Sequence, residues 1–266
     1  MDKMMFPEVG VTKRHLLLYY EKVAPKLLPQ LKNRPMTLER LPNGVGGPHF
    51  WQKNTPDYFP SWIPRAVLPT ADGKPVRYAL VNELDALLYL VDQGTVTFHP
   101  YLSTIDRLDR PDFVLFDLDP GTRGFRSAVE VALVLRAVLA ERELEATVKT
   151  SGMSGLHVLV PWKGEGGYDE AREWAMHVAR DAVVTTGKLA TTERLKSRRH
   201  GRLYVDVVQN ARGHHVVAPY SVRATPWATV STPLDWSEVD ARLDPRDFTV
   251  RSALGTRAHA GGRRAA

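Results

Sequence analysis

The sequence predicts an α+β fold in which a split βαβ sheet follows a mixed α/β N-terminal module. Between residues 113 and 210 the hydrophobic pattern runs strand, helix, strand, strand, helix, strand, which is the order of a split βαβ unit. Hydrophobic residues make up 43% of the 266 residues, enough to fill a sizeable core. We therefore expect one domain over residues 1–250, with an N-terminal module over about 1–95 and the sheet module over 96–250.

A helix is predicted near the start of the chain. After Thr12 the segment KRHLLLYYEKVAPKLLPQL has apolar residues at helical spacing. Proline lacks the amide hydrogen that a helix interior needs, so Pro25 and Pro29 predict that this helix bends or stops there. From residue 34 to 69 the helical period is lost, and Pro, Gly and aromatic residues predict short strands and loops.

A second helix is predicted over ELDALLYLVDQ at 83–93. Asn82 precedes it as a candidate N-cap, and Gly94 follows as a C-terminal stop. The next segment, TVTFHP at 95–100, alternates as a strand does.

The second half of the chain has the clearer pattern. A capping-box pair, Ser127 and Glu130, precedes the strongest helical run, VALVLRAVLAERELEA. A second amphipathic helix is predicted over 170–184. Strands are predicted at 113–119, 147–152, 156–161, 203–210 and 216–222. The Gly-, Ala- and Arg-rich segment 251–266 is predicted to be a disordered tail or a linker.

Composition limits the classes of function. The net charge of +6 and the pI near 9.5 favour polyanionic partners such as nucleic acid, although an ordinary basic surface fits equally well. The absence of cysteine excludes disulfides, thiolate metal sites and a thiol nucleophile. The start of the chain lacks the pattern of a signal peptide, and no apolar run has the length of a membrane span. We expect a cytoplasmic protein with no membrane contact.

Acidic residues in apolar strands are the first candidates for chemistry. Asp117 and Asp119 share one face of the strand FVLFDLD, about 6 to 7 Å apart at Cα, and could converge on a divalent metal ion. Alternatively, they cap the following loop or pair with Arg123 and Arg126. Asp206 lies in another β-branched run, where an unpartnered acid is costly. Three such acids favour a carboxylate metal site suited to phosphoryl transfer.

The segment KTSGMSGLHV at 149–158 supplies candidate phosphate contacts. Its glycines allow close backbone approach, and Ser151 can donate a hydrogen bond to a phosphate. His157 enters a strand, where a structural role is the common one, and a Ser151–His157 nucleophile pair is disfavoured because no G-x-S-x-G elbow is present. Arginines at 196–202 and Arg223 suit phosphate binding or a solvated surface.

In this order, the motifs DLD, KTSGxxGLHV, DxxQN and APYSVR resemble the polymerase domain of bacterial ligase D, in the archaeo-eukaryotic primase-polymerase superfamily. The segment RPMTLERLPNGVGGPHFWQKN at 34–54 extends the resemblance over nearly the whole chain. The resemblance implies the primase-polymerase fold, whose catalytic sheet is RRM-like, whether the chain is a stand-alone member or part of a ligase fusion.

The resemblance also implies roles for individual residues. The implied metal ligands and catalytic residues are Asp117, Asp119 and Asp206, which would hold two Mn²⁺ or Mg²⁺ ions. The implied nucleotide-binding residues are Ser151, His157, Arg223, Lys53, Arg199, Gln209 and His99. The implied DNA-binding residues are Phe50 and Trp51, which would stack on the template, and Lys3 and Lys13, which would recognise a 5′-phosphate. Ser154 stands where the family often has lysine.

The implied activity is template-dependent extension of a primer 3′-hydroxyl with NTPs or dNTPs, in gap filling during non-homologous end joining. The implied partners are DNA with gaps or broken ends, nucleoside triphosphates, a ligase and a Ku-like end-binding protein, at the nucleoid. Three alternatives stay open: a primase or excision-repair polymerase, a non-catalytic nucleic-acid-binding module, and a metal-dependent phosphoesterase.

Overall fold

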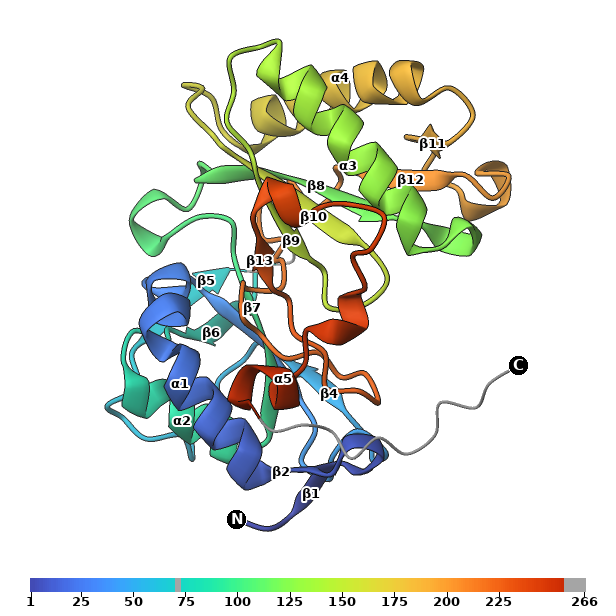
Figure 1. Cartoon of the computed structure of the whole chain (residues 1–266). Helices are drawn as coiled ribbons and strands as arrows, with labels where there is room; N and C mark the ends of the chain where they lie inside the picture. The colour runs from blue at the N-terminus through green and yellow to red at the C-terminus, as the bar shows by residue number, and fades with distance from the viewer. Residues whose placement is uncertain (70–72, 256–266) are drawn as a thin grey trace, which may run out of the picture.

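Two sheets, each with its own helices, form the frame of the protein, as a computed structural model shows for residues 1–69 and 73–255 (Figure 1). The strands are β1 (Met4–Phe6), β2 (Val11–Thr12), β3 (Met36–Arg40), β4 (Phe50–Gln52), β5 (Arg65–Pro69), β6 (Pro75–Ala79), β7 (Thr95–Pro100), β8 (Phe113–Asp119), β9 (Thr147–Thr150), β10 (Leu156–Pro161), β11 (Ala190–Thr191), β12 (Leu203–Asp206) and β13 (Pro233–Leu234). The α-helices are α1 (Lys13–Leu31), α2 (Leu84–Asp92), α3 (Phe125–Ala140), α4 (Tyr168–Thr186) and α5 (Val250–Leu254).

The second sheet has the strand order β11-β12-β8-β10-β9-β13. Its four inner strands, β12, β8, β10 and β9, pair antiparallel. Across the sheet they are the fourth, first, third and second of these strands along the chain, which is the order of a split βαβ unit. Helices α3 and α4 lie together over one face of this sheet (Figure 1). Their apolar residues pack with Val114, Phe116 and Leu118 of β8 in one core. The α+β prediction and its split βαβ sheet are therefore confirmed.

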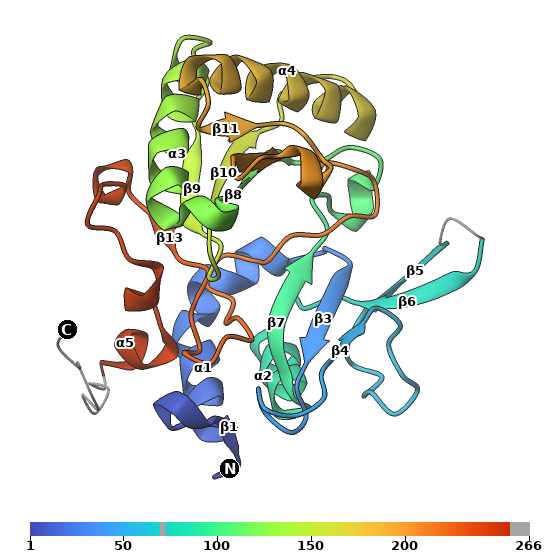
Figure 2. The same cartoon turned by 90° about the vertical axis from the view of Figure 1, so that its right-hand side faces the viewer.

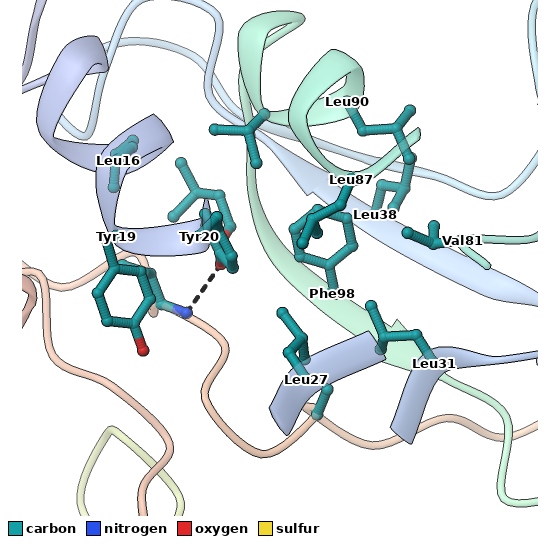
Figure 3. Packing of buried hydrophobic residues seen from close by; sticks show 14 of the residues in the cluster. Leu16, Tyr19, Tyr20, Leu27, Leu31, Leu38, Val81, Leu87, Leu90 and Phe98 are labelled. Atoms are coloured by element: carbon teal, nitrogen blue, oxygen red, sulfur yellow. Dashed lines mark hydrogen bonds between the residues drawn. The ribbon is translucent and has the colours of Figure 1, made fainter. Parts of the chain in front are cut away.

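The first sheet is formed by β4-β3-β6-β5, with β7 also paired to β3. Helices α1 and α2 pack against it, so that Tyr20 and Leu27 of α1 meet Leu87 of α2 and Phe98 of β7 in a buried cluster (Figure 3). The β5–β6 hairpin projects away from the body of the protein (Figure 2). Since β7 covers 95–100, the first sheet extends past the expected module boundary near residue 95.

The C-terminal part of the chain returns from the second sheet to the first module. Strand β13 pairs with β9, and the chain then reaches α5, which contacts α1. Val222, Val230 and Val250 belong to the core of the first module. Residues 250–254, including the start of the predicted tail, are therefore helical, and residues 256–266 lie outside the described part of the chain.

Two helix predictions need correction in the first module. The predicted stop at Pro25 or Pro29 is wrong: helix α1 continues to Leu31, because its buried face packs along the first core over its whole length. Asn82 does not cap α2, whose N-cap is Glu83. The Asn82 side chain instead exchanges hydrogen bonds with the backbone and side chain of Asn33.

Further corrections concern the second half. Helix α3 starts after Gly124 and ends at Ala140, so Ser127 lies inside its first turn, where its hydroxyl donates to the Gly124 carbonyl. The strand predicted over 203–210 ends at Asp206, where the next residues turn. Residues 216–222 form no named strand; Val222 makes an isolated bridge to Val230. None of the helices among the described residues is long and apolar enough to cross a membrane.

Candidate active site

One row of side chains crosses the open face of the second sheet. Asp206 of β12 lies directly opposite Asp117 of β8, Asp117 opposite His157 of β10, and His157 opposite Lys149 of β9. Directly opposed residues of antiparallel strands point to the same face. Strand register therefore brings together four polar side chains from segments up to 89 residues apart, from Asp117 to Asp206.

The strand alternation predicted for β8 is confirmed. Val114, Phe116 and Leu118 are buried beneath the helices, and Asp117 and Asp119 face the other side. Asp119 is the next residue on that face and lies opposite Tyr204. This arrangement places two acids of one strand beside the acid of its neighbour.

The three acids influence each other's ionisation. Burial, followed by the negative charges of Asp117 and Asp206, raises the pKa of Asp119 to about 6. Burial likewise raises the pKa of Asp206, and Asp117 adds to the increase. Burial alone would raise the pKa of Asp117, but the neighbouring His157 holds it below the usual value. Mutual repulsion of this kind is what a bound cation relieves.

The acids fit a divalent cation by chemistry, although the side chains of Asp117 and Asp206 already have protein partners. Oxygen-only donor sets suit Mg²⁺ and Mn²⁺. Asp206 Oδ1 accepts hydrogen bonds from Val208 N at 2.7 Å and from the Tyr204 hydroxyl at 3.2 Å, while Asp117 Oδ1 lies 3.4 Å from His157 Nε2. Within residues 1–69 and 73–255, no three His, Asp or Glu side chains already converge as a metal cage.

The raised pKa of Asp119 predicts how stability depends on pH without metal. A carboxyl whose pKa is higher when folded destabilises the fold as pH rises from about 4, its unfolded value, through about 6. In EDTA, Asp119→Asn should therefore raise the melting temperature at pH 8 more than at pH 4. Thermal unfolding at both pH values measures this. The exposed Asp106→Asn is the control, and an equal gain for Asp119→Asn at both pH values would contradict the prediction.

The loop between β9 and β10 is held tightly against its surroundings. Ser151 Oγ accepts hydrogen bonds from Met153 N and Gly155 N, both at 3.1 Å, so its hydroxyl proton is available to another group. A Cβ on Gly155 would lie 2.1 Å from the Leu118 carbonyl oxygen, and one on Gly152, which has φ +72°, would meet Arg223 Cγ at 2.5 Å. Both glycines are needed for this close approach.

A cleft of about 410 Å³ lies over Asp117 and Asp119, between the two sheets, and Asp206 is not among its lining residues. It is lined by His99, Asp117, Asp119, Ser151, Met153, Ser154, His157, Gln209, His215, Val216, Val217 and Arg223. Seven of the residues predicted for the site therefore meet in one cleft: Asp117, Asp119, Ser151, His157, Arg223, Gln209 and His99.

Arg223 and His99 have polar atoms without partners among the described residues. Arg223 Nη2 contacts Met153 Sδ at 2.9 Å, but its buried Nε has no hydrogen-bond acceptor. Burial lowers the pKa of Arg223, and the nearby Glu39 and Asp117 oppose that effect. His99 Nε2 is likewise buried and unpaired, and burial holds its pKa well below the usual value. Such groups are suited to receive a polar ligand.

Sequence reasoning missed His215 and Lys149. His215 lies at the cleft, its ring centroid 5.5 Å from that of His99. Burial, followed by the charge of Lys53, lowers its pKa to about 4. No hydrophobic period marks its loop. Lys149 could have been found, because the alternation of TVKT places it on the face opposite the buried Val148.

The remaining predicted nucleotide contacts lie at the rim. Lys53 follows β4 and is close enough to His215 to influence its ionisation. The Arg199 guanidinium stacks 3.8 Å from the centre of the Tyr204 ring and donates to the carbonyls of Glu193 and Arg194. Its charge lowers the pKa of Asp119, in opposition to burial and the other acids.

The predicted DNA-binding residues fall into two places. Phe50 and Trp51 are consecutive on β4 and point to opposite faces, Phe50 toward Arg40 and Trp51 toward His99, with ring centroids 4.8 Å apart in the second pair. Both are about half exposed. Lys3 and Lys13 are joined by a backbone hydrogen bond of 2.8 Å between Lys13 N and Lys3 O. The Lys13 ammonium pairs with Asp92, and that of Lys3 with Asn43.

Two alternative interpretations of the acids and the serine find no support in these contacts. Arg123 donates to the carbonyls of Gly201 and Lys188, and Arg126 pairs with Glu130, so neither neutralises Asp117 or Asp119. The His157 ring contacts Lys149 and Asp117, and Ser151 Oγ accepts from backbone amides. A serine–histidine nucleophile pair is therefore not formed.

The open face of a split βαβ sheet has adjacent carboxylates beside a cleft lined by Arg223 and His99. This arrangement suits a nucleotidyltransferase. The model of the family described as "LigD, primase-polymerase domain" matches residues 12–262. The chain belongs to this family, and the resemblance seen in the sequence motifs is confirmed. Nucleotidyl transfer in this family generally uses divalent metal ions.

Individual relatives agree with this assignment. The chain is 34% identical over 256 residues to the bifunctional non-homologous end joining protein LigD of Bacillus subtilis, covering 96% of this chain and 41% of that protein. For the multifunctional LigD of Mycolicibacterium smegmatis, identity is 32% over 241 residues, covering 90% and 32%. The chain thus spans less than half of each relative's length.

A solved structure extends the comparison to the fold. The polymerase domain from Mycobacterium tuberculosis ligase D in complex with DNA matches with a TM-score of 0.88 and 29% identity. The match covers 96% of this chain and 91% of that one. The likeness therefore includes both modules.

Proposed function

We propose that this protein is a template-directed polymerase that extends a primer 3′-hydroxyl with NTPs or dNTPs, filling gaps during end joining of broken DNA. The observation that supports this most strongly is the row from Asp206 through Asp117 to His157, because Asp117 and His157 line one cleft together with Arg223. The names of the relatives, which are end joining proteins, and the DNA in the matching structure agree with it.

The chain's own residues define where each part of the reaction takes place. The nucleophile is the primer 3′-hydroxyl, so the protein needs no nucleophilic side chain. Arg223, the Ser151 hydroxyl and His157 are positioned to hold the triphosphate and to stabilise the charge that develops as pyrophosphate leaves. Gln209 and His99 line the same cleft and are proposed to contact the nucleotide.

Asp117, Asp119 and Asp206 are the proposed ligands of two Mn²⁺ or Mg²⁺ ions. Bound divalent ions supply activation of the hydroxyl and neutralisation of the leaving phosphates. Burial, and after it the repulsion between the acids, raises the pKa of Asp119 and of Asp206, and a cation would remove the repulsive part.

The aromatic and basic residues of the first module are proposed to bind DNA. Both rings are about half exposed, and Trp51 lies next to the cleft-lining His99, where a template base can stack on an aromatic ring. Arg199 and Lys53 at the rim, and Lys3 and Lys13 near the chain start, are proposed contacts to nucleotide and 5′-phosphate. The proposed protein partners are a ligase and a Ku-like end-binding protein. The proposed location is the cytoplasm, in association with the nucleoid.

A gapped duplex distinguishes the candidate functions. The protein is incubated with it in Mn²⁺ or Mg²⁺, with and without NTPs or dNTPs, and the products are resolved by length. We expect extension only by the nucleotide that complements the template, and only with metal. Salt-sensitive binding without a product would indicate a binding module. Strand cleavage without nucleotides would indicate a phosphoesterase, and either outcome would overturn the proposal.

A further inference from the structure

A buried lysine occupies the end of the row that crosses the second sheet. The Lys149 side chain is among the largest fully buried ones, although it has an amine at its tip. Its Nζ lies 2.9 Å from His157 Nδ1 and 2.7 Å from Ser231 Oγ. A lysine is almost never fully buried unless it is paired, so these two contacts account for its position.

The hydrogen-bond pattern fixes the direction of the contact with Ser231. The Ser231 hydroxyl donates its single proton to the Thr150 carbonyl at 2.8 Å. Its oxygen must therefore accept the hydrogen bond from Lys149 Nζ. The amine is thus held by an acceptor whose own orientation is set by the backbone of β9.

The contact with His157 has a direction as well. His157 Nε2 faces Asp117 Oδ1 at 3.4 Å, and a carboxylate only accepts hydrogen bonds. Nε2 must then bear a proton, and a neutral imidazole has its acceptor lone pair on the other nitrogen. Nδ1 therefore accepts a hydrogen bond from Lys149.

We propose that Lys149 is a positioning residue that holds His157 in its Nε2–H form and directs that N–H toward the carboxylates and the cleft. It does not touch the nucleotide. The lysine acts from behind the ring, at the nitrogen remote from Asp117. Its importance increases when Asp117 turns to another partner, because Lys149 is then the contact that keeps the proton on Nε2. The kinetic part of this inference rests on the proposed nucleotide-binding role of His157.

The tautomer is measured in the free protein and does not depend on any activity. Two-dimensional ¹⁵N–¹H spectra of ¹⁵N-histidine-labelled protein, with His157 assigned by its loss in His157→Ala, report which nitrogen is protonated. We expect Nε2–H in the parent protein and a mixture of tautomers in Lys149→Met. A ring protonated at Nδ1 in the parent protein, or a Lys149→Met ring that stays wholly Nε2–H, would overturn the inference.

Lys149→Met suits this test because it replaces a buried amine with an apolar side chain of similar length. Its two hydrogen-bond partners, Ser231 and the His157 ring, are uncharged, so the substitution leaves neither of them as an unpaired buried charge and the variant is expected to fold. Thr150→Val is the matched control. It removes the hydrogen bonds that the Thr150 hydroxyl donates to Val230 O and accepts from Thr232 N, and Thr150 lies on the opposite face of β9 from Lys149. It should lower the melting temperature and leave the His157 tautomer unchanged.

A double-mutant cycle then separates positioning from general support of the fold. Lys149→Met should raise the KM for the incoming nucleotide about tenfold, the effect of one weakened hydrogen bond to a charged group. In a His157→Ala background it should have no further effect, because the ring through which it acts is gone. Equal losses in both backgrounds would overturn the kinetic part. If no variant or parent extends DNA, the proposed function fails while the tautomer result stands.

Discussion

Asp117→Ala is expected to reduce extension of a gapped primer–template about a thousandfold or more. Asp117 is the central acid of the row, directly opposite both Asp206 and His157. Its loss would remove one of the three proposed ligands of the metal ions. Several kcal/mol of charge stabilisation then disappear, and about 4 kcal/mol corresponds to a thousandfold in rate. Single-turnover extension in Mn²⁺ measures this loss.

DNA binding distinguishes this loss from misfolding. Asp117→Ala also removes negative charge near the DNA, so its affinity for the gapped duplex should be unchanged or higher. Asp181→Ala, an exposed acid on α4 that pairs with Arg142, is the control and should retain full extension. Extension by Asp117→Ala at the rate of this control would exclude the proposed metal role.

The strand positions of the acids could be predicted from sequence because alternation is a local property. FVLFDLD alternates cleanly, and Asp117 and Asp119 do share the open face. That Asp206 lies opposite Asp117, and not opposite Asp119, depends on the register between β12 and β8, which no local pattern specifies. For the same reason the link from His157 to Lys149 required the structure, although both residues belong to one short segment.

The predictions that failed concern polar residues and prolines whose roles are set by distant contacts. Asn82 has the composition of a helix cap, but its amide bonds to Asn33, 49 residues away. Pro25 would end an isolated helix, yet α1 continues because its opposite face is buried against the first core. Residues 216–222 are rich in β-branched residues but pass between the sheets, where Val217 and Val222 join different cores. Tertiary packing outweighs propensity in each case.

Arg223→Met is expected to lower kcat/KM for the nucleotide about a hundredfold while the protein stays as stable as before. A charge-assisted hydrogen bond to phosphate contributes about 1.5–3 kcal/mol, and the cleft offers the Arg223 guanidinium no full set of partners without a ligand. The buried Nε of Arg223 lacks an acceptor among the described residues, which destabilises the folded protein. This cost offsets the stabilisation from the attraction of Arg223 to Glu39 and Asp117. The melting temperature should therefore be unchanged or higher.

Arg65→Met provides the matched comparison for Arg223→Met. Arg65 of β5 also has a buried Nε without a partner in the described chain, and its Nη2 donates to the Phe59 carbonyl, but it does not line the cleft. Its loss should leave the nucleotide KM unchanged. If Arg223→Met reduced stability and activity together, as a purely structural arginine would, the phosphate contact would be refuted. An arginine that binds a ligand loses nucleotide affinity at constant stability when it is replaced. Its partner is the phosphate of the nucleotide, which contributes nothing to the stability of the free protein.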